Sequence, residues 1–194
     1  ILDQFDVLIF SDVDAKLFQL APSFFDRRQF GRQVLTFPDR IRLTVEAVRA
    51  GKGAMFLGGW YSFTGELGKG GWGRTQLRDL LPVTCLEHED LIESTEGFTG
   101  EATASGRQCL PTIDFAQIPP ILGYNRTLPS PDGEVLACWR ETGDPLLAVR
   151  PCGRGRVLAY TSDPAPHWGC NFVFWDQYPA FWLACLDWIL GANA

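Results

Sequence analysis

Two short apolar runs near the start of the chain flank a segment with helical periodicity. Residues 6–14 (DVLIFSDVD) are apolar and end in acidic residues, a pattern typical of a buried parallel strand. Residues 37–53 (FPDRIRLTVEAVRAGKG) place Ile41 and Val45 at helical spacing, and glycines end the pattern. Residues 54–59 (AMFLGG) predict the next strand. Strand, helix and strand in this order predict a βαβ unit with a right-handed crossover.

The middle of the chain, from residue 65 to about residue 131, is rich in glycine and proline and has weak periodicity. Residues 77–83 (LRDLLPV) predict a short helix that passes into an extended segment. Residues 118–133 (IPPILGYNRTLPSPDG) contain several prolines and glycines, and we expect them to be mostly loop.

The last third shows clear strand and helix patterns. Three runs show the residue alternation typical of strands: 134–140 (EVLACWR), 145–151 (PLLAVRP) and 155–163 (GRVLAYTSD). The turns ETGD and CGRG between them predict hairpins. Residues 175–191 are apolar at i, i+3, i+4 and i+7, which predicts a helix that ends at Gly191. This order predicts a three-layer α/β domain with a mostly parallel sheet and late antiparallel strands.

Length and composition favour one domain over residues 1–194, because 46% of the 194 residues are hydrophobic. The net charge is −6 and no run of Lys or Arg exceeds two, so no electrostatic nucleic-acid interface is expected. No stretch approaches the ~20 apolar residues that span a membrane. We expect a cytoplasmic protein, and we expect natural sequence before Ile1, because the chain starts almost inside a strand without Met.

Cysteine and histidine usage argues against a metal site. The six cysteines form no CxxC pair or recurring spacing, and there are only two histidines. Reduced thiols are the expected state, and we expect neither a metal nor another cofactor. The cysteines are Cys85, Cys109, Cys138, Cys152, Cys170 and Cys185.

Three polar clusters follow predicted strands: residues 11–14 (SDVD), 58–65 (GGWYSFTG) and 161–169 (TSDPAPHWG). The carboxyl ends of parallel strands share one edge of a sheet, so these clusters are expected to meet there. Asp12 belongs to the first cluster and is a candidate ligand-binding residue.

His167 is a candidate general base in the third cluster. It lies between Pro166 and Trp168, and Asp163 or Asp176 could orient its ring. The alternative is a loop histidine bonded to a carboxylate for structural reasons. Asp163 and Trp168 are candidate ligand-binding residues beside it.

The turn at residues 58–65 offers weak nucleophiles. Ser62 is a candidate partner of His167, but the nearest glycines lie three residues away on each side, so the G-x-S-x-G elbow is absent. Cys170 is a second, weaker candidate. Trp60 and Tyr61 either wall a ligand pocket or cap the edge of the sheet.

The strings GGWYSF and SDPAPHW, together with GWGRTQLRDLLPV, ILGYN, GRGRVLAYTSD and the last predicted helix, resemble a known family across nearly the whole chain. It is the family of putative glutamine amidotransferases, in the class I glutamine amidotransferase-like superfamily and near the ThuA-like proteins. The resemblance implies a flavodoxin-like α/β sandwich with its site at the strand ends. Members usually carry another strand and helix at the N-terminus, which residues 1–194 are expected to lack.

The resemblance also implies a Cys–His–Glu triad, from which this sequence departs. The turn at residues 58–62 reads GGWYS and holds no Cys, and the position two after His167 is Gly169 instead of Glu. We therefore expect a glutamine amidotransferase-like protein without the usual catalytic Cys. It would bind or process a small polar ligand, a sugar or an amino-acid derivative.

Two alternatives stay open from the sequence. One is an active amidotransferase or amidohydrolase with Ser62 or Cys170 as a non-standard nucleophile. The other is a non-catalytic assembly module in which the aromatic residues form an interface. A homo-oligomer is an expected option in that case, because the apolar last helix could pack on the sheet and still face a partner.

Overall fold

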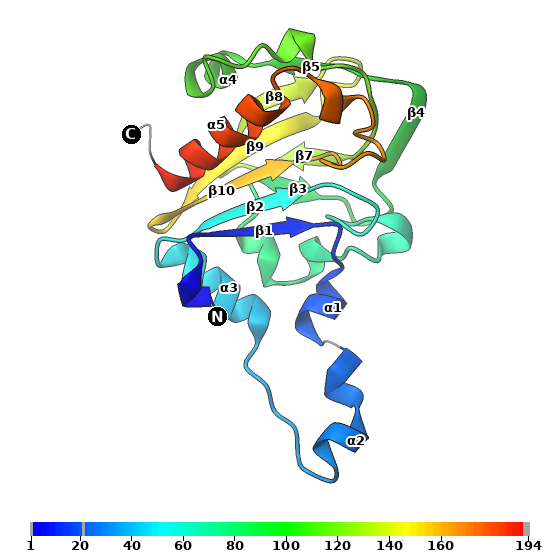
Figure 1. The fold of residues 1–194 in the computed structure, drawn as a ribbon, viewed down its shortest axis with the longest axis vertical. Helices are drawn as coiled ribbons and strands as arrows, with labels where there is room; N and C mark the ends of the chain where they lie inside the picture. Colours follow the sequence, from blue (N-terminus) through cyan, green and yellow to red (C-terminus); the bar gives the residue numbers. More distant parts are fainter. Residues whose placement is uncertain (1, 21, 192–194) are drawn as a thin grey trace.

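A six-stranded sheet forms the centre of the protein in a computed structural model that describes residues 2–20 and 22–191 (Figure 1). The strand order is β1-β2-β10-β9-β8-β5. The strands are β1 (Val7–Ser11), β2 (Gly53–Leu57), β10 (Gly155–Tyr160), β9 (Pro145–Cys152), β8 (Glu134–Trp139) and β5 (Gly100–Ala102).

The sheet is mixed. β2 pairs in parallel with both β1 and β10, whereas β10–β9, β9–β8 and β8–β5 are antiparallel. The predicted first strands, the βαβ order and the two late hairpins are confirmed. The antiparallel strands make up a larger part of the sheet than the sequence led us to expect, because β5 adds a further one at the edge.

Helices cover the sheet on both faces. Successive side chains of a strand point to opposite faces, and those of β2 and β10 divide accordingly between two apolar clusters. The helix α3 (Arg40–Arg49) packs Ile41, Val45 and Val48 against the face that carries Phe56. The helix α5 (Tyr178–Leu190) packs Phe181 on the other face.

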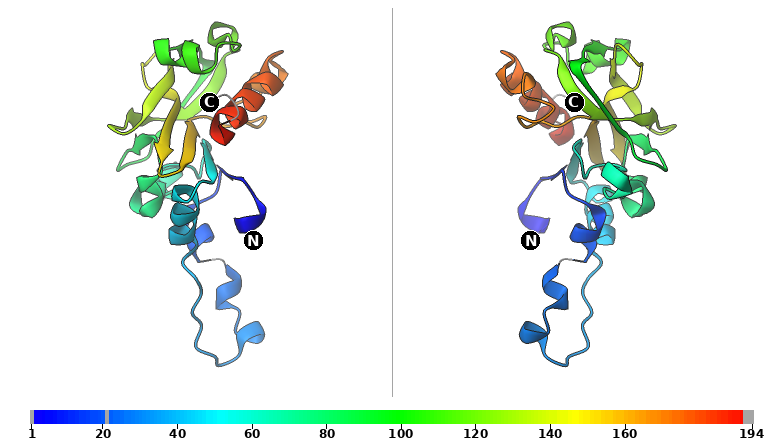
Figure 2. Two further views of the ribbon diagram at one scale, coloured as in Figure 1. Left: turned by 90° about the vertical axis from the view of Figure 1, so that its left-hand side faces the viewer. Right: turned by 90° about the vertical axis from the view of Figure 1, so that its right-hand side faces the viewer.

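Both long helices lie within the predicted ranges, although α5 begins at Tyr178 and not at residue 175. The Asp39 side chain caps α3 by accepting a hydrogen bond from the Arg42 amide at 3.1 Å. Gly191 ends α5 in the left-handed conformation, with φ of 74°. In Figure 2 the two helices lie on different sides of the sheet.

The middle of the chain contains more structure than expected. Residues 77–83 are confirmed as a short 3₁₀ helix (Gln76–Asp79) followed by the strand β3 (Val83–Cys85). The prediction that residues 118–133 are mostly loop is wrong. They form β6 (Ile121–Asn125) and β7 (Thr127–Pro129), which pair with β4 (Leu91–Phe98) and β3. These strands are stabilised by distant partners, which local periodicity does not reveal.

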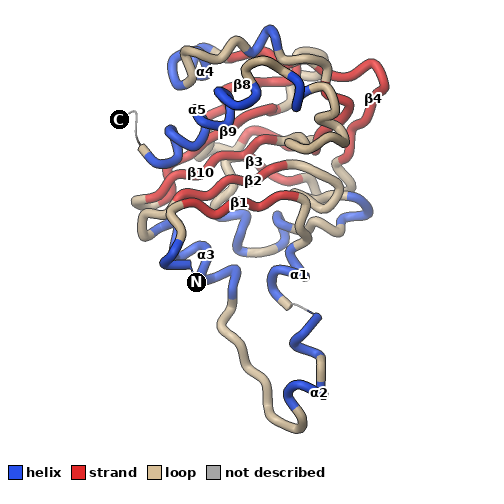
Figure 3. Tube along the Cα trace, in the orientation of Figure 1, coloured by secondary structure: helices blue, strands red, loops and turns tan. Residues whose placement is uncertain are grey.

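The remaining helices are short. Between β1 and α3 the chain leaves the body and returns, a segment the sequence analysis did not predict (Figures 1 and 3). The short helices are η1 (Leu2–Gln4), α1 (Ala15–Gln19), η2 (Pro22–Phe25), α2 (Arg27–Phe30), η3 (Glu66–Gly68), η4 (Trp72–Arg74), α4 (Ala104–Cys109), η6 (Phe115–Gln117) and η7 (Phe172–Phe174). Within the described part of the chain, no helix has the length and apolar character needed to cross a membrane.

Candidate functional site

The three polar clusters meet at the carboxyl edge of the parallel strands. The Tyr61 amide donates a hydrogen bond to the Asp12 carboxylate at 2.6 Å, which joins the ends of β1 and β2. The rings of Trp60 and His167 lie edge to face, with centroids 5.0 Å apart, which joins the ends of β2 and β10. The structure thus brings together residues that are far apart in the sequence, because their strands run in parallel.

Two glycines allow the turn after β2 to fit between its neighbours. A Cβ atom on Gly58 would lie 2.5 Å from the carbonyl oxygen of Thr161, at the end of β10. A Cβ atom on Gly59 would lie 2.7 Å from the Asp12 carboxylate, and its φ of 147° suits glycine alone. The glycine pair therefore permits the close approach of three strand ends.

A buried amide and a buried carboxylate hold this turn from behind. The Asn125 side chain, at the end of β6, accepts a hydrogen bond from the Gly59 amide at 2.8 Å and donates one to the Gly59 carbonyl at 3.1 Å. It also donates to Asp90 at 2.9 Å. Asp90 in turn accepts from the amides of Thr64 and Gly65 at 2.9 and 3.0 Å. Burial raises the pKa of Asp90 although these hydrogen bonds favour its charged form.

Ser62 is part of the same scaffold. Its side chain is fully buried, and its hydroxyl donates to the Leu57 carbonyl at 2.7 Å and accepts from the Asp12 amide at 3.1 Å. In residues 2–20 and 22–191 no hydrogen bond joins this hydroxyl to His167. The geometry favours a structural role for Ser62.

His167 is open to solvent and paired with Asp163. Its Nδ1 atom lies 3.5 Å from the Asp163 carboxylate, and 48% of the imidazole side chain is exposed against 14% for Asp163. Burial raises the pKa of Asp163, and the nearby charge of Asp12 adds to this effect, whereas the charge of His167 lowers it. Asp163, and not Asp176, is the carboxylate that faces the ring.

Glu93 on β4 is a member of the cluster that the sequence analysis missed. Its carboxylate accepts hydrogen bonds from the indole N–H groups of Trp168 at 2.7 Å and of Trp60 at 3.4 Å. Glu93 lies in a run of charged residues that resembles an ordinary solvated loop, so no local signal points to it. Glu93 reaches both tryptophans because β4 lies beside the turn after β2 and the loop after β10.

The two tryptophans differ in what they offer a ligand. Trp60 is 41% exposed, whereas Trp168 is only 2% exposed and packs against Gly123, whose missing Cβ makes room for the indole. Of the two predicted ligand-binding tryptophans, Trp60 therefore has surface open to solvent and Trp168 has little. Tyr61 is half-buried, and the Lys69 ammonium lies 5.6 Å from the centre of its ring.

The cysteines are free thiols throughout the described residues. The Cys170 amide donates to the His167 carbonyl at 3.3 Å, but no hydrogen bond joins the Cys170 thiol to the imidazole in the part of the chain described. Burial raises the pKa of Cys85 to about 12 and that of Cys185 still further. Among the described residues, no three or more His, Cys, Asp or Glu side chains are arranged to hold a metal ion.

This mixed α/β fold, with polar loops gathered at the carboxyl edge of its parallel strands, is consistent with a glutamine amidotransferase-like class of protein. Residues 1–191 match the model of the family described as "Putative glutamine amidotransferase". The chain belongs to that family, as its motifs indicated.

Two solved structures from Salmonella are similar to this chain over almost its whole length. Cytoplasmic Protein STM1381 from Salmonella typhimurium LT2 is 32% identical, with a TM-score of 0.84, over 96% of this chain and 72% of that protein. Cytoplasmic Protein STM3548 from Salmonella typhimurium is 29% identical, with a TM-score of 0.84, over 97% and 73% of the two chains. The structure called mmIFT52 N-terminal domain, at 9% identity and a TM-score of 0.51 over 82% and 74%, shares the fold alone. No curated protein matches the sequence.

Proposed function

We propose that this chain is a glutamine amidotransferase-like protein that binds a small polar ligand at the carboxyl edge of β1, β2 and β10. The ligand class is a sugar or an amino-acid derivative. The proposal includes a flavodoxin-like, three-layer arrangement, a cytoplasmic location and no cofactor. One observation carries it: an exposed imidazole, paired with a carboxylate, packs against an exposed tryptophan at the end of β2.

The exposed aromatic ring supports a polar ligand with one apolar face. Trp60 presents 41% of its surface, and its indole N–H is held by Glu93, so the ring is oriented before a ligand arrives. Ligand sites commonly combine an aromatic wall with a few well-placed polar groups. Sugars fit this description, because they carry hydroxyls around the rim of an apolar ring face.

The paired imidazole supports hydrogen bonding or proton transfer. With Asp163 at Nδ1, the other ring nitrogen of His167 is available to a ligand hydroxyl or amine. If a reaction takes place here, His167 is the general base and Asp163 is the residue that orients it.

The hydrogen bonds of Ser62 in the turn after β2 argue against acyl transfer. Amidotransfer needs a nucleophile within reach of the base, at ~2.6–3.2 Å. The Ser62 hydroxyl is instead bonded to the Leu57 carbonyl and the Asp12 amide, and in the described residues no hydrogen bond joins a cysteine thiol to His167. Ser62 therefore supports the carboxyl edge of β1, β2 and β10, where we propose that the ligand binds.

Covalent labelling tests the missing nucleophile. The protein is incubated with 6-diazo-5-oxo-norleucine, a glutamine mimic that alkylates competent nucleophiles, and its intact mass is measured. We expect no adduct on the folded protein. A single adduct that disappears in His167→Ala would instead identify an amidotransferase with a non-standard nucleophile.

Ligand-observed NMR against a panel of sugars and amino-acid derivatives tests the binding edge. Trp60→Ala and His167→Ala are each expected to weaken binding at least tenfold. The matched controls are Phe174→Ala, another exposed aromatic residue, and His88→Ala, an exposed loop histidine. The binding proposal fails if no member of the panel binds, or if the control variants weaken binding as much as the site variants. Either result would favour the alternative of a non-catalytic assembly module.

A further inference from the structure

Residues 16–20 and 22–40, which we call the arm, extend far beyond the body of the protein. The arm leaves after the start of α1, includes α2, and returns along an extended segment to α3 (Figures 1 and 3). The side views in Figure 2 show the same projection, so it does not result from the viewing direction.

The arm is held in shape mainly by its own side chains. The rings of Phe24 and Phe37 stack at 4.1 Å between centroids, and Phe30 meets Phe37 edge to face at 5.8 Å. The Arg27 guanidinium donates to the Gln33 carbonyl at 2.9 Å, which ties the outgoing helix to the returning segment. These contacts fix the conformation of the arm but leave much of its outer surface exposed to solvent.

Much of that surface is apolar. Val34 is 92% exposed and Phe25 is 68% exposed, and Leu17 and Leu20 are each about half exposed. Near the root of the arm, Phe18, Phe24, Phe37 and Leu43 line part of a cavity of about 530 Å³. Exposed apolar patches of this kind mark interaction surfaces in soluble proteins.

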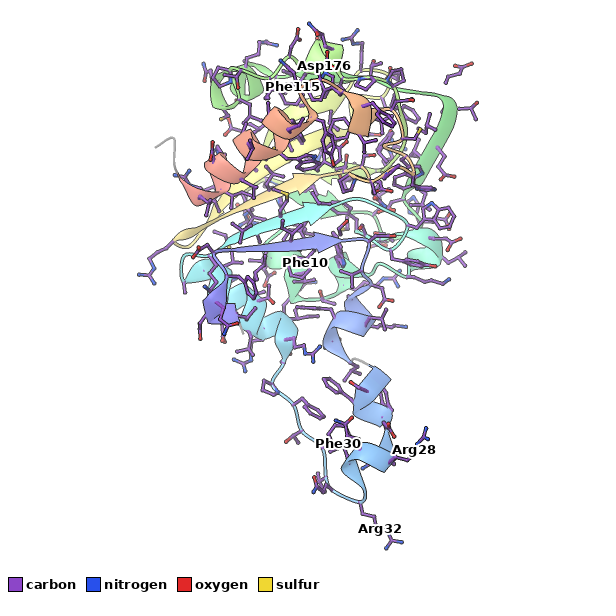
Figure 4. The ribbon with its side chains drawn as sticks, viewed as in Figure 1. Phe10, Arg28, Phe30, Arg32, Phe115 and Asp176 are labelled. Carbon is purple, nitrogen blue, oxygen red and sulfur yellow. The ribbon has the colours of Figure 1, made fainter. Side chains whose placement is uncertain are left out.

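The arm differs in charge from the rest of the chain. The arm holds five of the 17 basic residues and two of the 23 acidic ones, so it carries +3 while the rest of the chain carries −9. Arg28 and Arg32 point outward at its tip (Figure 4). Residues 80–106, by contrast, hold six acidic residues and no Lys or Arg, and we call this segment the acidic strip.

The acidic strip belongs to a different part of the surface. It includes the strand β4, and its exposed carboxylates include Glu87, Glu93 and Glu96. In Figure 1, β4 runs along the right-hand side of the upper part of the body, whereas the tip of the arm lies at the bottom of the view. The arm therefore does not reach the strip of its own chain, whereas a second copy in the opposite orientation presents a strip to each arm.

We propose that two copies of this chain form a two-fold dimer in which the arm of each copy lies along the acidic strip of the other. Such an interface is isologous, so every arm–strip contact is made twice. Apolar side chains of the arm are covered, and its arginines meet carboxylates of the partner. This inference does not depend on the proposed ligand site.

Charge reversal tests the pairing. The arm variant is Arg28→Glu with Arg32→Glu, and the strip variant is Glu87→Lys with Glu96→Lys. The matched control, Lys52→Glu with Arg154→Glu, reverses two charges outside both surfaces. Mass is measured by light scattering after size exclusion over the micromolar range, and circular dichroism checks that each variant is folded.

The wild-type protein and the control are expected to be dimers, and each reversed variant a monomer. An equal mixture of the two variants is expected to recover the dimer, because each reversed arm then faces a reversed strip, and each natural arm a natural strip. A monomeric wild-type protein, dimeric reversed variants or a mixture that stays monomeric would overturn the proposal.

A cross-linking measurement keeps the proposal testable if the reversed variants do not fold. Arg28→Lys keeps the charge and supplies an amine for carbodiimide coupling to a carboxylate. In a mixture of ¹⁴N- and ¹⁵N-labelled protein, we expect mixed-isotope links between residue 28 and the acidic strip. Finding no such link, or only links within one chain, contradicts the arm–strip contact.

Discussion

The turn after β2 and the loop after β10 lie side by side but use their polar side chains differently. Ser62 in the turn is buried together with Asn125 and Asp90 from other segments, and all three side chains bond to the backbone around the turn. In the loop, His167 is about half exposed, and its ring contacts the Asp163 carboxylate and the edge of Trp60. The first region is thus built from buried side chains that support the turn, whereas the second leaves a polar side chain open to solvent. The proposed ligand contact therefore belongs to the loop after β10, and Ser62 belongs to the support.

The largest expected effect comes from removing the amide that holds the turn. Asn125→Leu leaves the Gly59 amide without its buried partner and removes one of the three hydrogen bonds that the Asp90 carboxylate accepts from Asn125, Thr64 and Gly65. We expect a loss of about 3 kcal/mol in the free energy of unfolding, measured by chemical denaturation. Asn171→Leu, which removes an exposed amide that donates to the Pro120 carbonyl, should cost less than about 1 kcal/mol. Equal losses in the two variants would contradict the scaffold role.

Ser62→Ala tests whether the Ser62 hydroxyl supports the turn or acts as a nucleophile. Loss of the bonds to the Leu57 carbonyl and the Asp12 amide should lower the free energy of unfolding by about 1–2 kcal/mol. Ligand binding per folded molecule should stay the same. Ser130→Ala is the control, because the Ser130 hydroxyl accepts a long, exposed hydrogen bond from the Asp132 amide at 3.4 Å. A Ser62 variant of normal stability that has lost activity would favour the nucleophile instead.

The raised pKa of Asp90 predicts how the stability of the scaffold depends on pH. A carboxyl whose pKa is higher in the folded state stabilises the fold fully below its ordinary pKa, near 4. That contribution is lost as the pH rises through the folded-state pKa. Asp90→Asn should therefore destabilise the protein more, relative to wild type, at about pH 4 than at pH 7. Denaturation curves across this range, with Asp132→Asn for background, test the sign, and a larger penalty at pH 7 would contradict it.

The smallest effect on stability is expected in the exposed loop. His167→Ala removes a half-exposed side chain with one long ion pair, so the free energy of unfolding should change by less than about 0.5 kcal/mol. The same variant should nevertheless lose ligand binding, the reverse of Ser62→Ala. A stability loss as large as that of Asn125→Leu would place His167 in the scaffold and remove the contrast between the two regions.

Parts of the fold and of the site could be predicted because their signals are local. The helices α3 and α5 carry helical periodicity with end signals, and the late hairpins carry alternation and turn residues. The meeting of Asp12, Trp60 and His167 followed from the parallel strands. The arm carried no such signal, because its short helices have few apolar positions in register and little packing behind them.

The sequence alone determined the order of the main strands and helices, the family, and the absence of cysteine from the turn after β2. The tertiary structure decided what holds that turn and what remains free. Asn125 meets Gly59 across 66 positions of sequence, and Glu93 meets Trp168 across 75. Periodicity reports how a residue relates to its near neighbours along the chain. Contacts at such separations arise only when whole strands have packed, so the scaffold role of Ser62 and the place of Glu93 appear in the folded protein alone.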